Sequence, residues 1–293
     1  DTCYACVVAC KRVVEVTEGP FQVDPFYGGP EYETISTFGS YCGVDDLAAI
    51  AKANELCNKY GLDTISCGAT IAWAMDCFEH GLLTTADTDG LELRFGNAAA
   101  MVTMVEKIAR REGFGDVLAE GSARAAERLG RGQELVVAVK KQEMPAHMPQ
   151  VKRSLALIYA VNPFGADHQS SEHDPSYKYY PERMAQLDLL DPQPSKVLNA
   201  AKVRYAYYTQ VLYSALNSLG LCQFVWGPAW HLYDAAQMVD LVQAVTGWQV
   251  TLWELMKVGE RSLNMQRLFN AREGITRDLD RLPPKLFQPL QLL

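Results

Sequence analysis

The sequence has no apolar stretch as long as the roughly 20 residues that a membrane-spanning helix needs, so we expect no membrane association. It has no long run of lysine or arginine, and its formal net charge is −8. It therefore lacks the positive surface with which proteins bind nucleic-acid phosphates, and we expect no nucleic-acid partner. No signal peptide, internal repeat or low-complexity tract is found. The missing signal peptide says little, but the acidic composition is compatible with a soluble protein, for which we predict a cytoplasmic location.

The chain has 293 residues, of which 48% are hydrophobic, enough for a sizeable core in one large or two smaller domains. It opens at Asp1, two residues before a cysteine motif, which indicates an interior position in a longer gene product. The eight cysteines are not needed as disulfides in a chain with such a core. Four of them are interpreted as buried small hydrophobic residues, namely Cys42, Cys57, Cys67 and Cys77.

Helical periodicity dominates the first half of the chain after residue 45. Each periodic run is followed by glycine, and acidic or asparagine residues precede two of them, as is typical of helix ends. We therefore predict an all-α block. The four runs are residues 47–60, 65–80, 97–112 and 116–129.

The remaining segments are less regular. A short β-hairpin is predicted around Glu18-Gly19-Pro20, residues 26–41 read as a loop, and residues 135–139 are a strand candidate. From Pro145 to about Pro194 the chain is expected to be irregular. Helices resume at 196–219, 234–246 and 252–272. We predict a mainly α, multihelical fold with two helical domains, residues 1–140 and 141–293, and a small β-hairpin near the N-terminus.

Three cysteines stand close together at the start of the chain, as Cys3-x-x-Cys6-x-x-x-Cys10. Thiolates in one compact turn suit an iron–sulfur cluster or zinc. A cubane cluster needs a fourth ligand, which is often remote in the sequence. Structural zinc sites usually use a second short-spaced pair, and none follows here. The spacing favours a cluster, while zinc and a fortuitous grouping stay open.

Several further segments have sequences similar to segments of the aldehyde ferredoxin oxidoreductase family and occur in the same order. Each is weakly specific alone, but together they run through nearly the whole chain. The sequence therefore resembles the C-terminal part of that family. The segments are CYACVVAC, GPEYET, ANELCNKYGLDTIS, GDVLAEG, NSLGLCQF and ERSLNMQRLFNAREGITRDLDRLPPKLF.

The resemblance implies two helical domains that follow an N-terminal β domain, which is absent here. That domain would share with this chain a bis-pterin cofactor holding tungsten, or molybdenum. The implied activity is oxidation of a small aldehyde to a carboxylic acid, with electrons passed through a [4Fe–4S] cluster to ferredoxin. The fragment is expected to be inactive without the N-terminal domain, and a homodimer is compatible with the resemblance.

The resemblance also assigns ligands. The family's four cluster ligands match Cys3, Cys6, Cys10 and Cys222. Its two pterin-binding motifs begin with aspartate, whereas both begin with asparagine here, which loses a charge but can still accept a hydrogen bond. The first motif comprises Asn58, Gly61, Leu62 and Asp63, and the second comprises Asn217, Gly220, Leu221 and Cys222.

The implied catalytic residues are a glutamate and a histidine. Glu33 or Glu31 matches the carboxylate beside the metal, where it would assist proton movement. His168 matches the active-site imidazole that polarises the substrate carbonyl, and His173 is a possible substitute. The segment MPAHMPQVKRSL differs from the usual sequence of the family and indicates a divergent subfamily.

Two other functions remain as alternatives. One is an aryl-thioester reductase-like member of the same family, which the residues after Pro145 would decide. The other is a non-catalytic helical module with a structural zinc ion, which would make a colourless protein with one zinc per chain.

Overall fold

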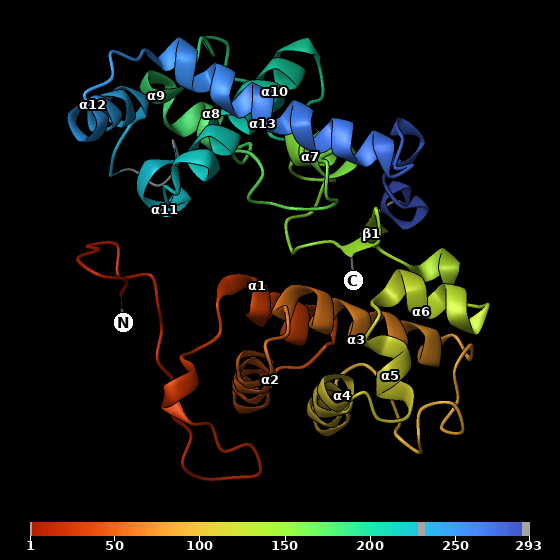
Figure 1. Cartoon of the computed structure of the whole chain (residues 1–293). Helices are drawn as coiled ribbons and strands as arrows, with labels where there is room; N and C mark the ends of the chain where they lie inside the picture. Colours follow the sequence, from red (N-terminus) through yellow and green to blue (C-terminus); the bar gives the residue numbers. More distant parts are fainter. Residues whose placement is uncertain (1, 228–231, 289–293) are drawn as a thin grey trace. The chain divides into compact units, whose positions relative to one another are not determined.

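The computed structural model describes residues 2–227 and 232–288. The prediction of a mainly α, multihelical fold is confirmed within these residues (Figure 1). The chain divides into two compact units. The first comprises the residues up to Ala146 together with the tail from Pro283, and the second runs from His147 to Leu282. In the described part of the chain no helix combines the length and the apolarity that crossing a membrane demands.

The first unit contains the helical block that the glycine-punctuated runs predict. The fourth predicted helix breaks at Gly121 into two shorter ones. Side chains of Asp46, Asp63 and Asn97 cap the first three helices by accepting hydrogen bonds from backbone N–H groups. The helices are α2 (Leu47–Tyr60), α3 (Thr64–Glu79), α4 (Ala98–Arg110), α5 (Phe114–Leu118) and α6 (Ser122–Leu129).

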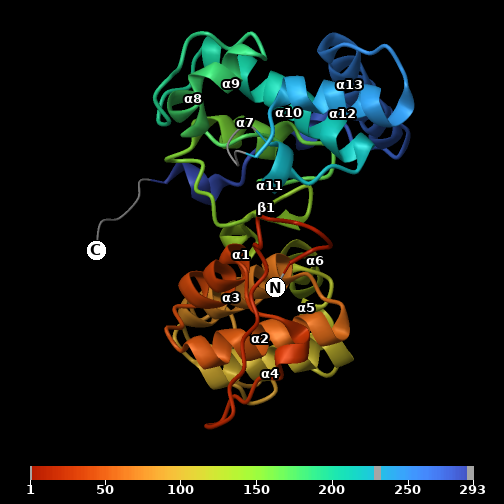
Figure 2. The same cartoon turned by 90° about the vertical axis from the view of Figure 1, so that its left-hand side faces the viewer.

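The core of this unit lies where α2, α3 and α4 meet, and Figure 2 shows α2 lying beside α4. Ile71 on α3 and Met101 and Met104 on α4 are fully buried there. Gly68 on α3 allows a close approach, because a Cβ at that position would lie 2.7 Å from Thr37 Oγ1. This contact brings the segment around Thr37 directly against α3.

The prediction that residues 26–41 form a loop is wrong. The segment contains a short 3-10 helix (Pro25–Tyr27), α1 (Tyr32–Ile35) and a turn of π-helix (Ser36–Tyr41). Its glycine and aromatic content suggested a loop, but burial of Phe38 in the core and packing of Thr37 on α3 hold it helical. Single π-turns occur often at functional sites, and this one directly follows the candidate Glu33.

β-Structure in the described residues is minimal. The predicted N-terminal hairpin is reduced to one antiparallel bridge between Val16 and Val23, whose backbone groups exchange two hydrogen bonds. The strand candidate at 135–139 is reduced to its last two residues, β1 (Ala138–Val139), which pairs with β2 (Gln142–Glu143). Lys140 and Lys141 between them both have positive φ, as a tight hairpin turn requires.

The second unit also consists of helices. The predicted helices near 196–219, 234–246 and 252–272 are confirmed, but the prediction of an irregular stretch from 145 to 194 is wrong in part because it contains α7. The helices are α7 (Arg153–Val161), α8 (Ser176–Tyr179), α9 (Pro181–Ala185), α10 (Ala200–Leu219), α11 (Gln223–Trp226), α12 (Ala235–Thr246) and α13 (Leu252–Arg272).

The central feature of this unit is α10, which lies against both α7 and α13. Gly259 makes the approach to α13 possible, because any side chain there would overlap the backbone carbonyl of Val211. Leu212 and Leu216 are buried in the same interface, and Leu255 on α13 joins them. The two longest helices are therefore packed backbone to backbone at one point.

Candidate functional site

The cysteine segment at the N-terminus has no regular secondary structure but contains repeated tight turns. Ala5 and Ala9, the residues immediately before Cys6 and Cys10, both adopt the left-handed conformation, with φ of 52° and 49°. The Cys6 N–H donates to the Cys3 carbonyl at 3.1 Å. Cys3 is exposed and the other two thiols are partly exposed, so the segment presents three soft sulfur donors of the kind that iron–sulfur clusters and zinc bind.

The second group of cysteines is chemically different. Cys42, Cys57, Cys67 and Cys77 are free and buried, as interpreted from the sequence. Burial raises the pKa of Cys42 well above its usual range and raises that of Cys77 to about 12. Cys42 and Cys77 are therefore protonated at neutral pH, and all four cysteines serve as core residues.

The two predicted pterin motifs have the same local geometry, although one lies in each unit. Gly61 ends α2 and Gly220 ends α10, with φ and ψ of 71° and 37° against 68° and 26°. Only glycine adopts this left-handed conformation without strain. The next N–H, of Leu62 or Leu221, donates to the carbonyl five residues earlier, at 2.8 or 2.9 Å.

The motif's last residue is also equivalent in the two segments. Asp63 and Cys222 are extended, with φ and ψ of −69° and 122° against −72° and 128°, and each precedes a new helix. Both are exposed, as are Asn58 and Asn217 at the motif starts. Each segment therefore turns sharply out of a helix and presents a carboxylate in one unit and a thiol in the other.

Two of these motif residues also have structural contacts. The Asp63 carboxylate accepts the Ser66 N–H at 2.7 Å and caps α3. The Asn58 side chain donates to the Asn54 carbonyl at 3.0 Å, one turn earlier in α2. These contacts orient both side chains while leaving further lone pairs and N–H groups for a ligand.

The structure distinguishes the two candidate glutamates. Glu31 is exposed and forms a surface ion pair with Arg12 at 2.6 Å. Glu33, on α1, is only 8% exposed, and its Oε2 accepts the Ala146 N–H at 2.7 Å. Burial, followed by the nearby Glu33 charge, raises the pKa of Tyr41. Of the two carboxylates, Glu33 is thus the buried one, and a backbone donor orients it.

Three imidazoles gather around one ammonium group in the second unit. His147 stacks on His168 with ring centroids 5.0 Å apart and meets the edge of His173 at 4.3 Å. Lys152 Nζ lies 2.9 Å from His147 Nδ1 and 3.2 Å from His173 Nδ1. Because an ammonium group only donates, both rings are assigned as neutral tautomers with the proton on Nε2.

The tautomer of His173 fixes the backbone of the predicted catalytic histidine. His173 Nε2 donates to the His168 carbonyl oxygen at 3.0 Å. The His168 ring is partly buried, with Nδ1 3.8 Å from Asp167 Oδ1, too long for a hydrogen bond. His168 is thus held from both sides, by its ring neighbour His147 and by the His173 side chain.

A buried hydrogen-bond network holds the segment that contains His168 and His173, called here the histidine segment. The Glu172 carboxylate accepts the His173 N–H at 2.8 Å, the Ser176 hydroxyl at 3.0 Å and the Tyr213 hydroxyl at 2.9 Å. Burial, followed by the Glu172 charge, raises the pKa of Tyr213, so its hydroxyl remains a donor. The Tyr205 hydroxyl donates to the His173 carbonyl. The segment is therefore attached to α10 at several points.

The next carboxylate along the segment forms a fully buried ion pair. Asp174 pairs with Lys202 of α10, and both side chains have no exposed surface. The Ser154 N–H lies 3.1 Å from both Asp174 oxygens, and its hydroxyl donates to one of them. This pair connects the start of α7, the histidine segment and α10.

The position of His173 predicts a pH-dependent stability. Burial, with added repulsion from Lys152, lowers its pKa from 6.5 to about 3. His173 takes up a proton at about pH 6.5 in the unfolded chain but only near pH 3 in the folded chain. Protonation between these values therefore favours the unfolded chain, and the protein loses stability as the pH falls from 6.5 toward 3. We expect a pH-dependent difference between the free energies of unfolding of the wild type and His173→Asn. The wild-type value minus the variant value should rise by at most about 1.4 kcal/mol per pH unit up to pH 6.5 and stay constant above it.

Urea unfolding between pH 4 and 8 measures this difference. A His173→Asn difference without pH dependence would contradict the buried neutral state.

Sequence reasoning missed His147 and Lys152 as site residues. Both lie in the segment MPAHMPQVKRSL, whose sequence differs from the usual sequence of the family. The available signal was composition, because the chain has five histidines and three of them belong to this cluster. Their approach to His168 and His173, some 20 residues later, is not visible in the local pattern.

Comparison with known proteins identifies the class to which this fold and these segments belong. The sequence model of the family described as aldehyde ferredoxin oxidoreductase, domains 2 and 3, matches residues 1–292. The chain therefore belongs to the aldehyde ferredoxin oxidoreductase family of oxidoreductases and corresponds to those two domains.

Individual relatives agree with this assignment. The tungsten-containing aldehyde ferredoxin oxidoreductase of Pyrococcus furiosus is 38% identical over 289 residues, covering 97% of this chain and 44% of the relative. That of Thermococcus kodakarensis is 37% identical, covering 97% of this chain and 44% of the relative. The chain thus spans less than half the length of these curated relatives.

A more distant relative and a protein of similar structure have other activities in their names. The WOR-like subunit of the aliphatic sulfonate oxidoreductase of Pyrococcus furiosus is 26% identical, over 98% of this chain and 42% of the relative. Among solved structures, the active-site complex BamBC of benzoyl coenzyme A reductase, in complex with 1,5-dienoyl-CoA, matches with a TM-score of 0.78 and 20% identity. This match covers 99% of the chain and 47% of that protein, and it shows the shared fold alone.

Proposed function

We propose that the chain forms the C-terminal part of a tungsten- or molybdenum-pterin oxidoreductase. The whole protein oxidises a small aldehyde to a carboxylic acid and passes the electrons through a [4Fe–4S] cluster to ferredoxin. The chain contributes one part of the active site, and the remainder belongs to the N-terminal domain that its relatives possess. Without that domain the chain is inactive.

The observation that carries the proposal is the equivalence of the two glycine–leucine segments. Both present an exposed asparagine at the start and an exposed ligating side chain at the end, on nearly identical backbone angles. Two equal segments suit a cofactor with two equal halves, such as a bis-pterin. Cys222 belongs to one segment and also completes the thiol set of Cys3, Cys6 and Cys10.

The donor groups present fit these cofactors chemically. Four thiols outside the core are available for a cubane cluster. Amide and carboxylate groups of Asn58, Asp63 and Asn217 suit the N–H groups of pterins. When bound, the metal-pterin and the cluster supply the two-electron oxidation and the route by which the electrons leave.

Glu33 acts as the base in this proposal. Converting an aldehyde hydrate into a carboxylic acid releases two protons and two electrons. The buried Glu33 carboxylate accepts a proton from a hydroxyl of the hydrate. Its contact with the Ala146 N–H holds one carboxylate oxygen and orients the group.

His168 orients the substrate by donating a hydrogen bond to its oxygen. An imidazole can do this at neutral pH, and its position is held by the stacked ring of His147 and by the bond from His173. Lys152 fixes the tautomers of both neighbours and thereby acts as a positioning residue.

Elemental analysis of the intact protein, purified without oxygen, tests the assignment. We expect roughly four irons per chain together with tungsten or molybdenum. Cys222→Ala should lose most of the iron because it removes one of four ligands. Cys77→Ala is the control, since this buried thiol takes no part in the proposed site, and it should retain the iron.

The contrary result is one zinc per chain and no iron after cluster reconstitution. It would replace the oxidoreductase with a structural zinc module. Iron that persists in Cys222→Ala would instead remove Cys222 from the ligand set.

A further inference from the structure

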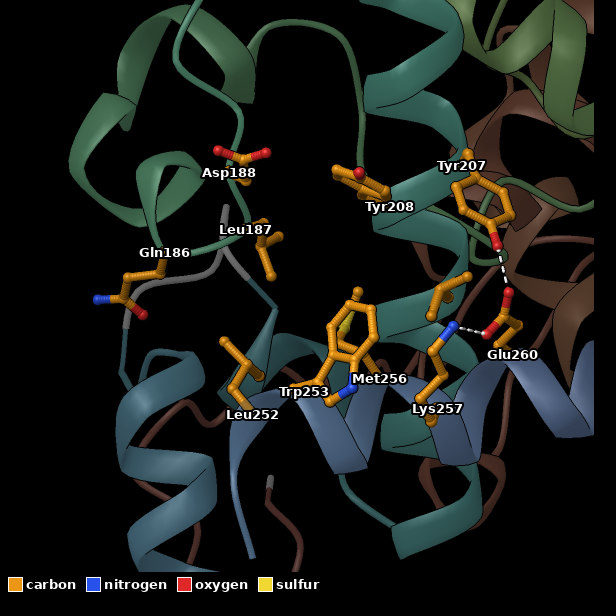
Figure 3. A pocket seen from close by; sticks show the side chains of 11 residues that line it. Gln186, Leu187, Asp188, Tyr207, Tyr208, Leu252, Trp253, Met256, Lys257 and Glu260 are labelled. Atoms are coloured by element: carbon orange, nitrogen blue, oxygen red, sulfur yellow. Dashed lines mark hydrogen bonds and ion pairs between the residues drawn. The ribbon is translucent and has the colours of Figure 1, made fainter.

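The second unit contains a cavity that none of the proposed catalytic residues lines. Its volume is about 330 Å³, at the lower end of the range for small-molecule sites. It lies between α10, α13 and the turn that follows α9 (Figure 3). Leu187, Val211, Leu252 and Met256 form its apolar floor.

Three aromatic side chains form much of the wall. Tyr207 and Tyr208 come from α10 and Trp253 comes from α13, and Figure 3 shows their rings around the same space. Trp253 is 69% exposed and Tyr207 is 46% exposed, so the cavity is open to solvent. Aromatic faces arranged in this way attract cations through the negative charge of their ring faces.

Most of the charge on the wall is internally compensated. Lys257 pairs with Glu260 and lies 4.7 Å from the Trp253 ring centroid. The Tyr207 hydroxyl donates to the other oxygen of Glu260 at 2.8 Å. The Lys257 charge is therefore already balanced, and an incoming anion would meet no uncompensated positive group among these residues.

Asp188 is different. It is an exposed residue of the cavity's lining, and its carboxylate makes no hydrogen bond or ion pair with any residue that the structure describes. Its backbone is left-handed, with φ of 59°, in the turn that follows α9. The Leu189 N–H donates back to Met184 across this turn, in the arrangement that glycine favours at helix ends.

The turn keeps Asp188 in place. Leu187 and Leu189 on either side of it are 5% and 1% exposed, so both anchor the turn in the core. An aspartate tolerates the left-handed conformation less well than glycine does. The local fold thus holds an uncompensated carboxylate in a strained position at the edge of an aromatic cavity.

We infer that this cavity is a second ligand site, which binds a small organic ammonium ion. The Asp188 carboxylate pairs with the ammonium group at the edge of the cavity, and the aromatic walls and the apolar floor enclose the rest of the ligand. A carboxylate combined with an aromatic cage recognises an ammonium group better than a neutral or anionic one. The inference is independent of the proposed oxidoreductase activity.

Calorimetric titration of the intact protein with three probes of similar size tests the site. The probes are 2-phenylethylammonium, neutral 3-phenylpropan-1-ol and anionic 3-phenylpropionate. We expect the cation to bind at least tenfold more tightly than either of the others. Asp188→Asn should weaken cation binding about tenfold and leave the binding of the neutral probe unchanged.

Two further variants separate binding from folding. Asp188→Gly removes the carboxylate but suits the left-handed turn, so it should raise the thermal midpoint while losing the preference for the cation. Trp253→Leu should weaken binding of the cation, and Trp253→Phe should retain part of it. Asp240→Asn, an exposed aspartate on α12, is the control and should bind as the wild type does.

Three outcomes would overturn the site. The first is equal binding of all three probes, which would indicate a plain apolar cavity. The second is cation binding that is unchanged in both Asp188→Gly and Trp253→Leu. The third is no binding of any probe to the intact protein, which would mean that another part of the protein covers the cavity.

Discussion

Replacing Lys202 by methionine is expected to lower the free energy of unfolding by about 3–5 kcal/mol. Lys202 and Asp174 have no exposed surface, and the ammonium group is the charged partner of that carboxylate. Methionine fills a similar volume but leaves the Asp174 charge buried with only the Ser154 donors. The loss is large because an uncompensated charge remains in the core.

Urea unfolding at pH 7 measures this effect. Lys178→Met, on the exposed part of α8, is the control and should change the free energy by less than about 0.5 kcal/mol. Adding Asp174→Asn to Lys202→Met removes the stranded charge and should recover part of the loss. An unchanged midpoint in Lys202→Met would mean that water reaches Asp174 in solution.

For the proposed aldehyde oxidation, in which we assign Glu33 as the base, Glu33→Gln is expected to lower kcat by about 10²–10⁴-fold, the usual contribution of a general base. Glutamine retains an oxygen that can accept the Ala146 N–H, so the fold around α1 is preserved. Because the lost function is proton transfer, KM should change much less than kcat.

The matched control for this variant is Glu31→Gln. Glu31 forms only a surface ion pair with Arg12, and such pairs contribute little. Its kcat should remain within about threefold of the wild type. Steady-state kinetics on the intact, metal-loaded protein gives both values. Equal losses in the two variants would indicate that neither carboxylate is the base.

Much of the fold could be predicted from local patterns. The helices of the first unit begin at capping residues such as Asp46 and Asn97 and end near glycine, so both their existence and their bounds follow from the sequence. The π-helical turn around Thr37 could not be predicted, because it depends on the close approach that Gly68 allows from another helix. The helix α7 was missed because prolines stand close to it on both sides, at Pro149 and Pro163.

The residues of the candidate site also fall into two groups, those that the local sequence predicts and those that only the folded chain reveals. The cysteine motif and the two glycine–leucine segments are continuous in sequence, so their residues could be named in advance. Burial separates Glu33 from Glu31, and burial is a property of the folded chain. The contact of Lys152 with His147 and His173 joins residues from different segments, and no spacing rule indicates it.

The helix α10 contributes to several of these features at once. Lys202, Tyr205 and Tyr213 hold the histidine segment, Gly220 directs the chain toward Cys222, and Tyr207 and Tyr208 line the second cavity. No residue from 208 to 216 is exposed. A substitution between residues 208 and 216 therefore disturbs a packed neighbour on some side of the helix, whereas the exposed positions of Val203 and Arg204 leave room for other side chains.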